Sequence, residues 1–166
     1  MELTNIISLE KWMELEKKIN RKTGLDVNVF NIAGIRITEF KKWANALCPA
    51  IKDTDKGQSF ICAVAHMNLA ALARDTKKTI IEECDAGLIK IVVPIFVNHE
   101  YSGAVGACGL LMDDGEVDSF LINKITEIEE DKIENLSIGI KTLSKEKQQE
   151  IAEFIEQQLD IILSAT

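Results

Sequence analysis

The chain has 166 residues, 46% hydrophobic and 28% charged, so it is long enough and apolar enough to fold as one globular domain over residues 1–166. Its formal net charge is −8, and no run of Lys and Arg offsets this charge, so direct binding to nucleic acid is disfavoured. No stretch reaches the run of about 18 apolar residues that a membrane span needs, and the first residues do not resemble an export signal. We therefore expect a cytoplasmic protein whose four cysteines are reduced thiols or metal ligands.

The N-terminal part of the chain predicts a helix followed by a β-hairpin. Ser8 is a suitable N-cap for a helix that reaches Thr23, and Gly24 is a natural stop. Residues 25–31 alternate between apolar and other side chains, which is typical of a strand. After a glycine-containing turn, residues 35–40 return as a second strand, so the two predict a hairpin.

The middle of the chain predicts helices and then further strands. Residues 41–75 favour helix, and the segment 60–73 is apolar on more than one face, so we expect that helix to be largely buried. Residues 79–83 predict a short strand. Two β-rich runs follow at 89–97 and 101–111, and the glycines of the second run indicate bulges or the close approach of another group.

The C-terminal part predicts helices around a polar, irregular segment. A helix over 117–130 precedes the irregular residues 131–142, and a long helix covers 144–164. This order of elements predicts an α+β fold in which an antiparallel sheet carries helices on one side that enclose a pocket. The last helix has an apolar stripe formed by Ile151, Phe154, Ile155, Leu159 and Ile162. Together with the first helix around Trp12, this stripe predicts a surface for a homodimer or a signalling partner, although packing against its own sheet is the simpler alternative.

Four cysteines, Cys48, Cys62, Cys84 and Cys108, lie beside apolar runs in the central half of the chain. Their wide spacing contains no Cys-x-x-Cys pair, so spacing alone favours buried core thiols over a metal site. Cys62 and His66 are four residues apart on a predicted helix and can share a metal from one helix face. The alternative is that His66 is a core histidine that bonds to a backbone carbonyl.

The cysteine-bearing pieces, in their order, resemble the PocR sensory domain, a PAS-like ligand-binding module of prokaryotic signalling proteins. The matching pieces are Thr23-Gly24-Leu25-Asp26-Val27, Cys48-Pro49-Ala50-Ile51, Cys62, Cys84-Asp85-Ala86-Gly87-Leu88, and Val93-Pro94-Ile95 followed by Gly103 and Gly106. The resemblance covers roughly residues 5–160. It implies a PAS-like antiparallel sheet with flanking N- and C-terminal helices, a small organic ligand, and signalling to a separate partner protein.

The resemblance also implies a role for the cysteines. If those of the matching pieces converge on one pocket, Cys108 can complete a four-thiolate site for an iron–sulfur cluster or for zinc. The wide spacing favours the cluster over zinc, and a plain organic ligand with no cofactor is an equal alternative. We expect Phe60, Ala63 and Met67 to line this pocket, together with alternate residues of the strands 89–97 and 103–111.

Signatures of common enzyme classes are absent from the sequence. It has no glycine-rich phosphate loop, no Ser-His-Asp order and no His-Glu-x-x-His motif, and it contains only two histidines. We therefore expect a sensor that is not an enzyme. The alternative from another class is a cysteine-based redox protein or enzyme with a reactive thiolate.

Overall fold

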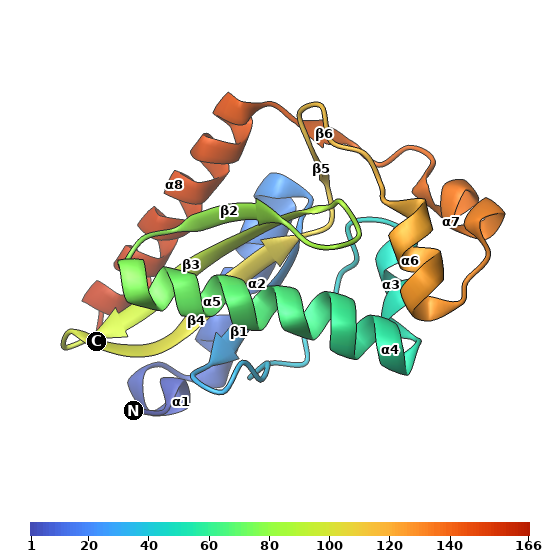
Figure 1. Ribbon diagram of the computed structural model, residues 1–166. Helices are drawn as coiled ribbons and strands as arrows, with labels where there is room; N and C mark the ends of the chain where they lie inside the picture. The colour runs from blue at the N-terminus through green and yellow to red at the C-terminus, as the bar shows by residue number, and fades with distance from the viewer.

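A four-stranded antiparallel sheet forms the centre of the computed structural model, which describes all residues from Met1 to Thr166 (Figure 1). The sheet has the strand order β1–β4–β3–β2. Its strands are β1 (Asp26–Asn31), β2 (Ile80–Glu83), β3 (Ile89–Val97) and β4 (Glu100–Cys108), and the short strands β5 (Leu111–Met112) and β6 (Thr142–Leu143) form a separate parallel pair. The predicted α+β class with an antiparallel sheet is confirmed.

Helices surround the sheet and flank it at both ends of the chain. They are α1 (Leu3–Ile6), α2 (Leu9–Thr23), α3 (Leu47–Lys52), α4 (Asp55–Gly57), the π-helix η1 (Gln58–Ala63), α5 (Val64–Thr76), α6 (Ser119–Thr126), α7 (Glu130–Ser137) and α8 (Lys145–Ser164). The helix α2 has the predicted ends, because the Ser8 hydroxyl accepts a bond from the Lys11 amide and Gly24 adopts a left-handed C-cap with φ of 75°. No helix is long and apolar enough to cross a membrane.

The two faces of the sheet differ in character. One face carries Val27, Ile91 and Val105 into the main hydrophobic core, which α2 and α8 cover. The other face carries Val92 and Ala104, which pack against α5 (Figure 1). Because side chains alternate along a strand, the second face also receives the polar residues of these strands. They are Asp26 and Asn28 of β1, Lys90 of β3 and Cys108 of β4, and all of them lie beneath the helices of that side.

The predicted hairpin at the start of the sheet forms only in part. Residues 35–40 form no strand, and only Arg36 makes an isolated bridge to Phe30. β1 pairs instead with β4, from Asp26 opposite Cys108 to Asn31 opposite Gly103. On its other edge, β1 exchanges only two backbone hydrogen bonds with residues 35–40, from Asn31 N–H to Ile35 O and from Ile37 N–H to Val29 O. The Val29 amide on that edge donates to the buried carboxylate of Glu16 at 2.7 Å. Since this amide is taken by a side chain, a full ladder on that edge does not form.

Two helical predictions also need correction. The helix predicted at 60–73 exists as η1 and α5, but its outer face exposes apolar side chains, among them Val64 and Leu72, so it is not largely buried. The segment 131–142, predicted as irregular, contains the helix α7. Its Ile133 is fully buried in a second hydrophobic cluster with α3, η1 and α6, which explains why a polar sequence becomes helical there.

The apolar stripe of α8 packs against its own chain. Ile151, Ile155 and Leu159 are buried in the main core, and Phe154 and Ile162 pack partly buried against it. Trp12 is also fully buried, and its indole N–H donates to the Leu3 carbonyl at 3.0 Å. The stripe predicted as a dimer or partner surface is therefore buried against the protein's own core. This is the simpler of the two alternatives.

Candidate functional site

All four cysteines line one cavity of about 310 Å³ between the polar face of the sheet and the η1–α5 helix. Each comes from a different element: Cys48 from α3, Cys62 from η1, Cys84 from the turn after β2, and Cys108 from the end of β4. All four are free thiols and partly buried. The fold thus brings together residues that lie up to 60 positions apart in the sequence.

The thiols surround the cavity and do not meet at a single point. No group of three or more His, Cys, Asp or Glu side chains is arranged to hold one metal ion. The thiols are nevertheless close enough to affect one another. Burial raises the pKa of Cys48, and the thiols of Cys108, Cys84 and Cys62 raise it further. Four sulfur atoms therefore line one shared space without being gathered around a single ion.

Hydrogen-bond donors of the protein point at two of the sulfur atoms. The Asn45 side-chain amide donates to Cys48 Sγ at 3.3 Å, and its carbonyl oxygen accepts from the Cys48 backbone N–H at 2.7 Å. Burial raises the pKa of Cys84 to about 11, whereas backbone N–H groups of Leu88 and Ala86 lower it by bonding to the sulfur. Such donors favour the thiolate form that a metal or cluster binds.

His66 lies in the same cavity with neither ring nitrogen bonded. The residue is 4% exposed, and its ring stacks on Phe30 with 3.7 Å between centroids. Both Nδ1 and Nε2 lack a hydrogen-bond partner, so the predicted bond to a backbone carbonyl is wrong. Burial lowers the pKa of His66 to about 3, with further lowering by Lys90 and Lys52, so the imidazole is neutral at pH 7. It can donate one bond and accept one from an occupant of the cavity.

Cationic side chains gather around the cavity although the protein is acidic. Lys90 is buried in β3, with its Nζ 5.4 Å from the centroid of the Phe30 ring. Arg36 donates to the Asn28 side-chain oxygen at 3.1 Å, and Lys52 lines the same wall. Lys41 forms a salt bridge to Asp26, the one carboxylate that lines the cavity.

Sequence reasoning found no cluster of basic residues, because the fold assembles this one from four distant positions, Arg36, Lys41, Lys52 and Lys90. Only Lys90 could have been singled out from the sequence. It is a charged residue inside the apolar run of β3, and a buried lysine in a strand usually has a role or a partner.

The predicted ligand residues divide between the cavity and the surface. Ala63 lines the cavity, whereas Phe60 and Met67 are 58% and 62% exposed and lie outside it. Phe60 and Met67 share the outer face of the helix with Val64, at ordinary helical spacing. Cys62 and His66 face the cavity together, as the four-residue spacing predicted.

Comparison with known proteins identifies a family. The family model of the sensory domain found in PocR matches residues 5–166, essentially the whole chain. Searches among curated proteins and among solved structures gave no match. The match agrees with the resemblance that the cysteine-bearing pieces carry, and it covers every element that lines the cavity. The chain therefore belongs to the PocR sensory domain family.

Proposed function

We propose that this protein is a sensor whose cavity holds an iron–sulfur cluster on Cys48, Cys62, Cys84 and Cys108, and that it signals the state of the cluster to a partner protein. Membership of a sensory domain family supports the sensory role. The observation that carries the proposal is that four cysteines from four elements line one cavity. Four thiolates are the usual ligand set of iron–sulfur clusters.

The arrangement of the thiols around the cavity favours a cluster over a single zinc ion. Zinc requires each sulfur at about 2.3 Å from the metal, and no three potential ligands are gathered around one point. The charges of the nearby side chains also support a cluster. Four thiolates place negative charge in a buried site, and the nearby Arg36, Lys52 and Lys90 offset it.

The chain's own residues would hold and adjust the sulfur ligands. Asn45 orients Cys48, and the backbone amides after Cys84 donate to its sulfur. Hydrogen bonds to the sulfurs are one of the means by which a protein sets the reduction potential of a cluster. When bound, a cluster supplies a reversible one-electron change, which is a signal that a sensor can transmit.

A second candidate is a small organic ligand bound in the same cavity without any cofactor. The observation that favours it is His66, whose two unpaired ring nitrogens offer one donor and one acceptor to a polar molecule. A reactive thiolate fits less well. Burial raises the pKa of Cys48, Cys62 and Cys84, whereas a nucleophilic cysteine needs a lowered pKa.

Purification without oxygen, followed by a visible spectrum and by iron and sulfide analysis, tests the proposal. We expect a coloured protein that contains both iron and acid-labile sulfide. The Cys84→Ser variant should lose most of the iron, while Met67→Leu, on the exposed outer face, should retain it. A colourless protein that contains zinc, or no metal at all, would contradict the cluster, and the metal-free result would favour the organic ligand.

A further inference from the structure

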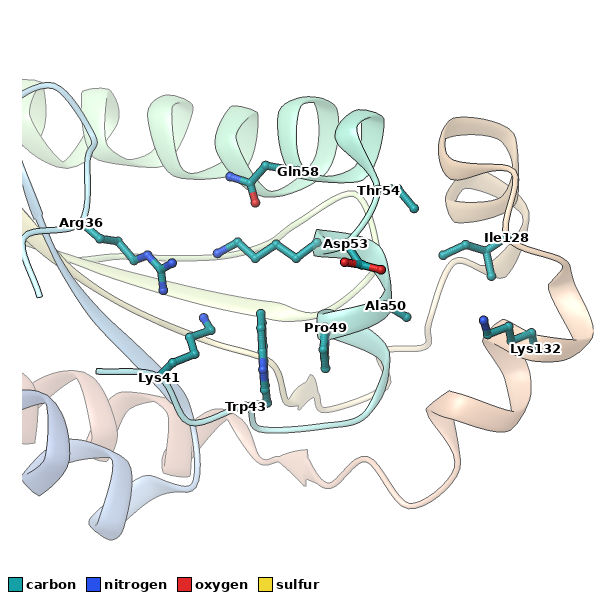
Figure 2. A pocket seen from close by; sticks show the side chains of 11 residues that line it. Arg36, Lys41, Trp43, Pro49, Ala50, Asp53, Thr54, Gln58, Ile128 and Lys132 are labelled. Atoms are coloured by element: carbon teal, nitrogen blue, oxygen red, sulfur yellow. The ribbon is translucent and has the colours of Figure 1, made fainter. Parts of the chain in front are cut away.

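An open cleft of about 830 Å³ lies at the surface beside the cysteine cavity (Figure 2). Arg36, Trp43, Lys52 and Gln58 line both spaces, so the cleft and the cavity share a wall. These residues come from the segment after β1, from the end of α3 and from the start of η1. A molecule that entered the cleft from solvent would lie next to the cavity.

The cleft is positively charged on a negatively charged protein. Its lining contains Arg36, Lys41, Lys52 and Lys132 but only one carboxylate, Asp53, whereas the whole chain has a net charge of −8. Figure 2 shows the side chains of Arg36 and Lys41 in the lining of the cleft, and Lys52 lines it from the end of α3. Such a local excess of one sign attracts ions of the opposite sign.

Three of these four cations, Arg36, Lys52 and Lys132, have no carboxylate partner. Lys41 is paired with Asp26, but Arg36 and Lys52 take part in no salt bridge. Arg36 uses one guanidinium nitrogen on the Asn28 side chain and keeps its other donors free. Burial lowers the pKa of Lys52, and the positive charges of Lys41 and Arg36 lower it further. An anion between these side chains would remove this unfavourable interaction.

Trp43 adds an aromatic surface to the same site. Lys41 Nζ lies 3.8 Å from the centroid of the Trp43 ring, and Lys52 Nζ lies 5.8 Å from it. These cation–π contacts hold both ammonium groups beside the indole. The side-chain amide of Gln58 faces the cleft from the other side (Figure 2). The cleft thus combines charged donors, a neutral amide and an apolar surface.

We propose that this cleft binds a small molecule that carries an oxyanion, a carboxylate or a phosphate, with the oxyanion between Arg36 and Lys52 and its carbon skeleton on Trp43. Guanidinium and ammonium groups are the side chains that recognise these anions best. The site does not require a cofactor on the cysteines. Because its wall is shared with the cavity, an anion bound there would also change the electrostatic environment of the sulfur atoms.

Titration of the full-length protein at low salt tests this site, with inorganic phosphate and succinate as separate probes. We expect a saturable change in tryptophan fluorescence with at least one probe, and calorimetry should give the same affinity. The change should come from Trp43, since Trp12 is fully buried in the core, and Trp43→Phe should abolish it. Saturation by phosphate alone identifies a phosphate ligand, and saturation by succinate alone identifies a carboxylate.

Charge-removing variants then assign the binding groups. Lys52→Gln and Arg36→Gln should each weaken binding about tenfold or more, as expected for the loss of a hydrogen bond to a charged group. Lys145→Gln, an exposed lysine at the start of α8, should bind like the wild type. Iron measured in every sample separates loss of a cofactor from loss of the anion site. No saturable binding of either probe, or equal weakening by all three substitutions, would overturn the proposal.

Discussion

His66 is the residue in the cavity whose bonding is least complete. Its ring is held by stacking on Phe30 and by burial, and both of its nitrogens lack partners. A buried polar atom without a partner costs free energy unless a ligand or water satisfies it. We therefore regard His66 as a residue kept for what enters the cavity, since an apolar ring of the same size would fill the space without this cost.

The His66→Phe variant should depend less on pH than the wild type. The folded protein holds the pKa of His66 at about 3, below its ordinary value of 6.5, because of burial and of the nearby Lys90 and Lys52. The stability that depends on neutral His66 is thus complete above pH 6.5 and is lost as the pH falls toward 3. Between pH 7 and pH 5 the wild type should lose about 2 kcal/mol more free energy of unfolding than the variant.

Urea denaturation at pH 7 and pH 5 measures this difference. Phenylalanine can keep the stacking on Phe30, so the variant should fold. Equal losses of stability in the two proteins would show that the imidazole is already protonated, or already solvated, in the folded state.

At the level of elements, local sequence signals predicted some structures well and others not. The helix α2 and the strand β3 were predictable, because their ends carry caps or turns and their apolar periods are long. The structure of residues 35–40 was not predictable. Pairing on that edge of β1 depends on Glu16, a side chain far away in the sequence. The outward position of Phe60 follows from the helix period, because a residue two positions before Cys62 lies on the opposite face of the helix.

Substitutions in α8 should separate its buried stripe from its exposed side. Ile155 is 0% exposed and Ile161 is 60% exposed. We expect Ile155→Ala to lower the free energy of unfolding by about 2–5 kcal/mol because it leaves a cavity in the core. Ile161→Ala should change it by less than about 0.5 kcal/mol. Thermal or urea unfolding measures both, and equal effects would mean that the stripe does not pack as described.

A glycine in β4 should be far less tolerant of a side chain than one in a loop. Gly103 has a φ of 153°, and an added Cβ would lie 2.2 Å from the backbone oxygen of Phe30 in β1. Gly139 also has a positive φ, 79°, but an added Cβ would meet nothing within 4 Å. Gly139→Ala should therefore cost about 1 kcal/mol from strain alone. Gly103→Ala should cost at least about twice as much, since the two strands must also separate. Urea unfolding measures both costs, and equal values would contradict the close approach of β1 and β4 at Gly103.

For the molecule as a whole, the sequence predicted the cysteines of the cavity but not the cations around it. Cys48, Cys62 and Cys84 were identifiable because they lie in the pieces that resemble the family, and their convergence with Cys108 in one cavity follows from the fold. The cations were not identifiable. Arg36, Lys41 and Lys52 look like ordinary surface residues in the sequence, and only the path of the chain between β1 and η1 places them around one wall.

Loss of the proposed cluster should lower the thermal stability of the whole protein. A cluster held by the four cysteines would bind the folded state and not the unfolded chain, so its removal would cost stability. If the free cluster concentration is a hundred times the dissociation constant, the lost stability is about 2.7 kcal/mol. For a chain of this size, this loss corresponds to a fall in Tm of roughly 5–10 °C. Calorimetry of protein kept without oxygen, before and after removal of iron, measures the shift. The iron-free Cys84→Ser variant should show no shift under the same treatment.

The most direct measurement is a crystal structure of the protein purified without oxygen, with diffraction data collected at the iron absorption edge. We predict one strong anomalous peak inside the cavity, with the sulfur atoms of Cys48, Cys62, Cys84 and Cys108 bonded around it. Anomalous density that lies elsewhere, or four free thiols around an iron-free cavity, would contradict the assignment of these cysteines as the ligands of one cluster.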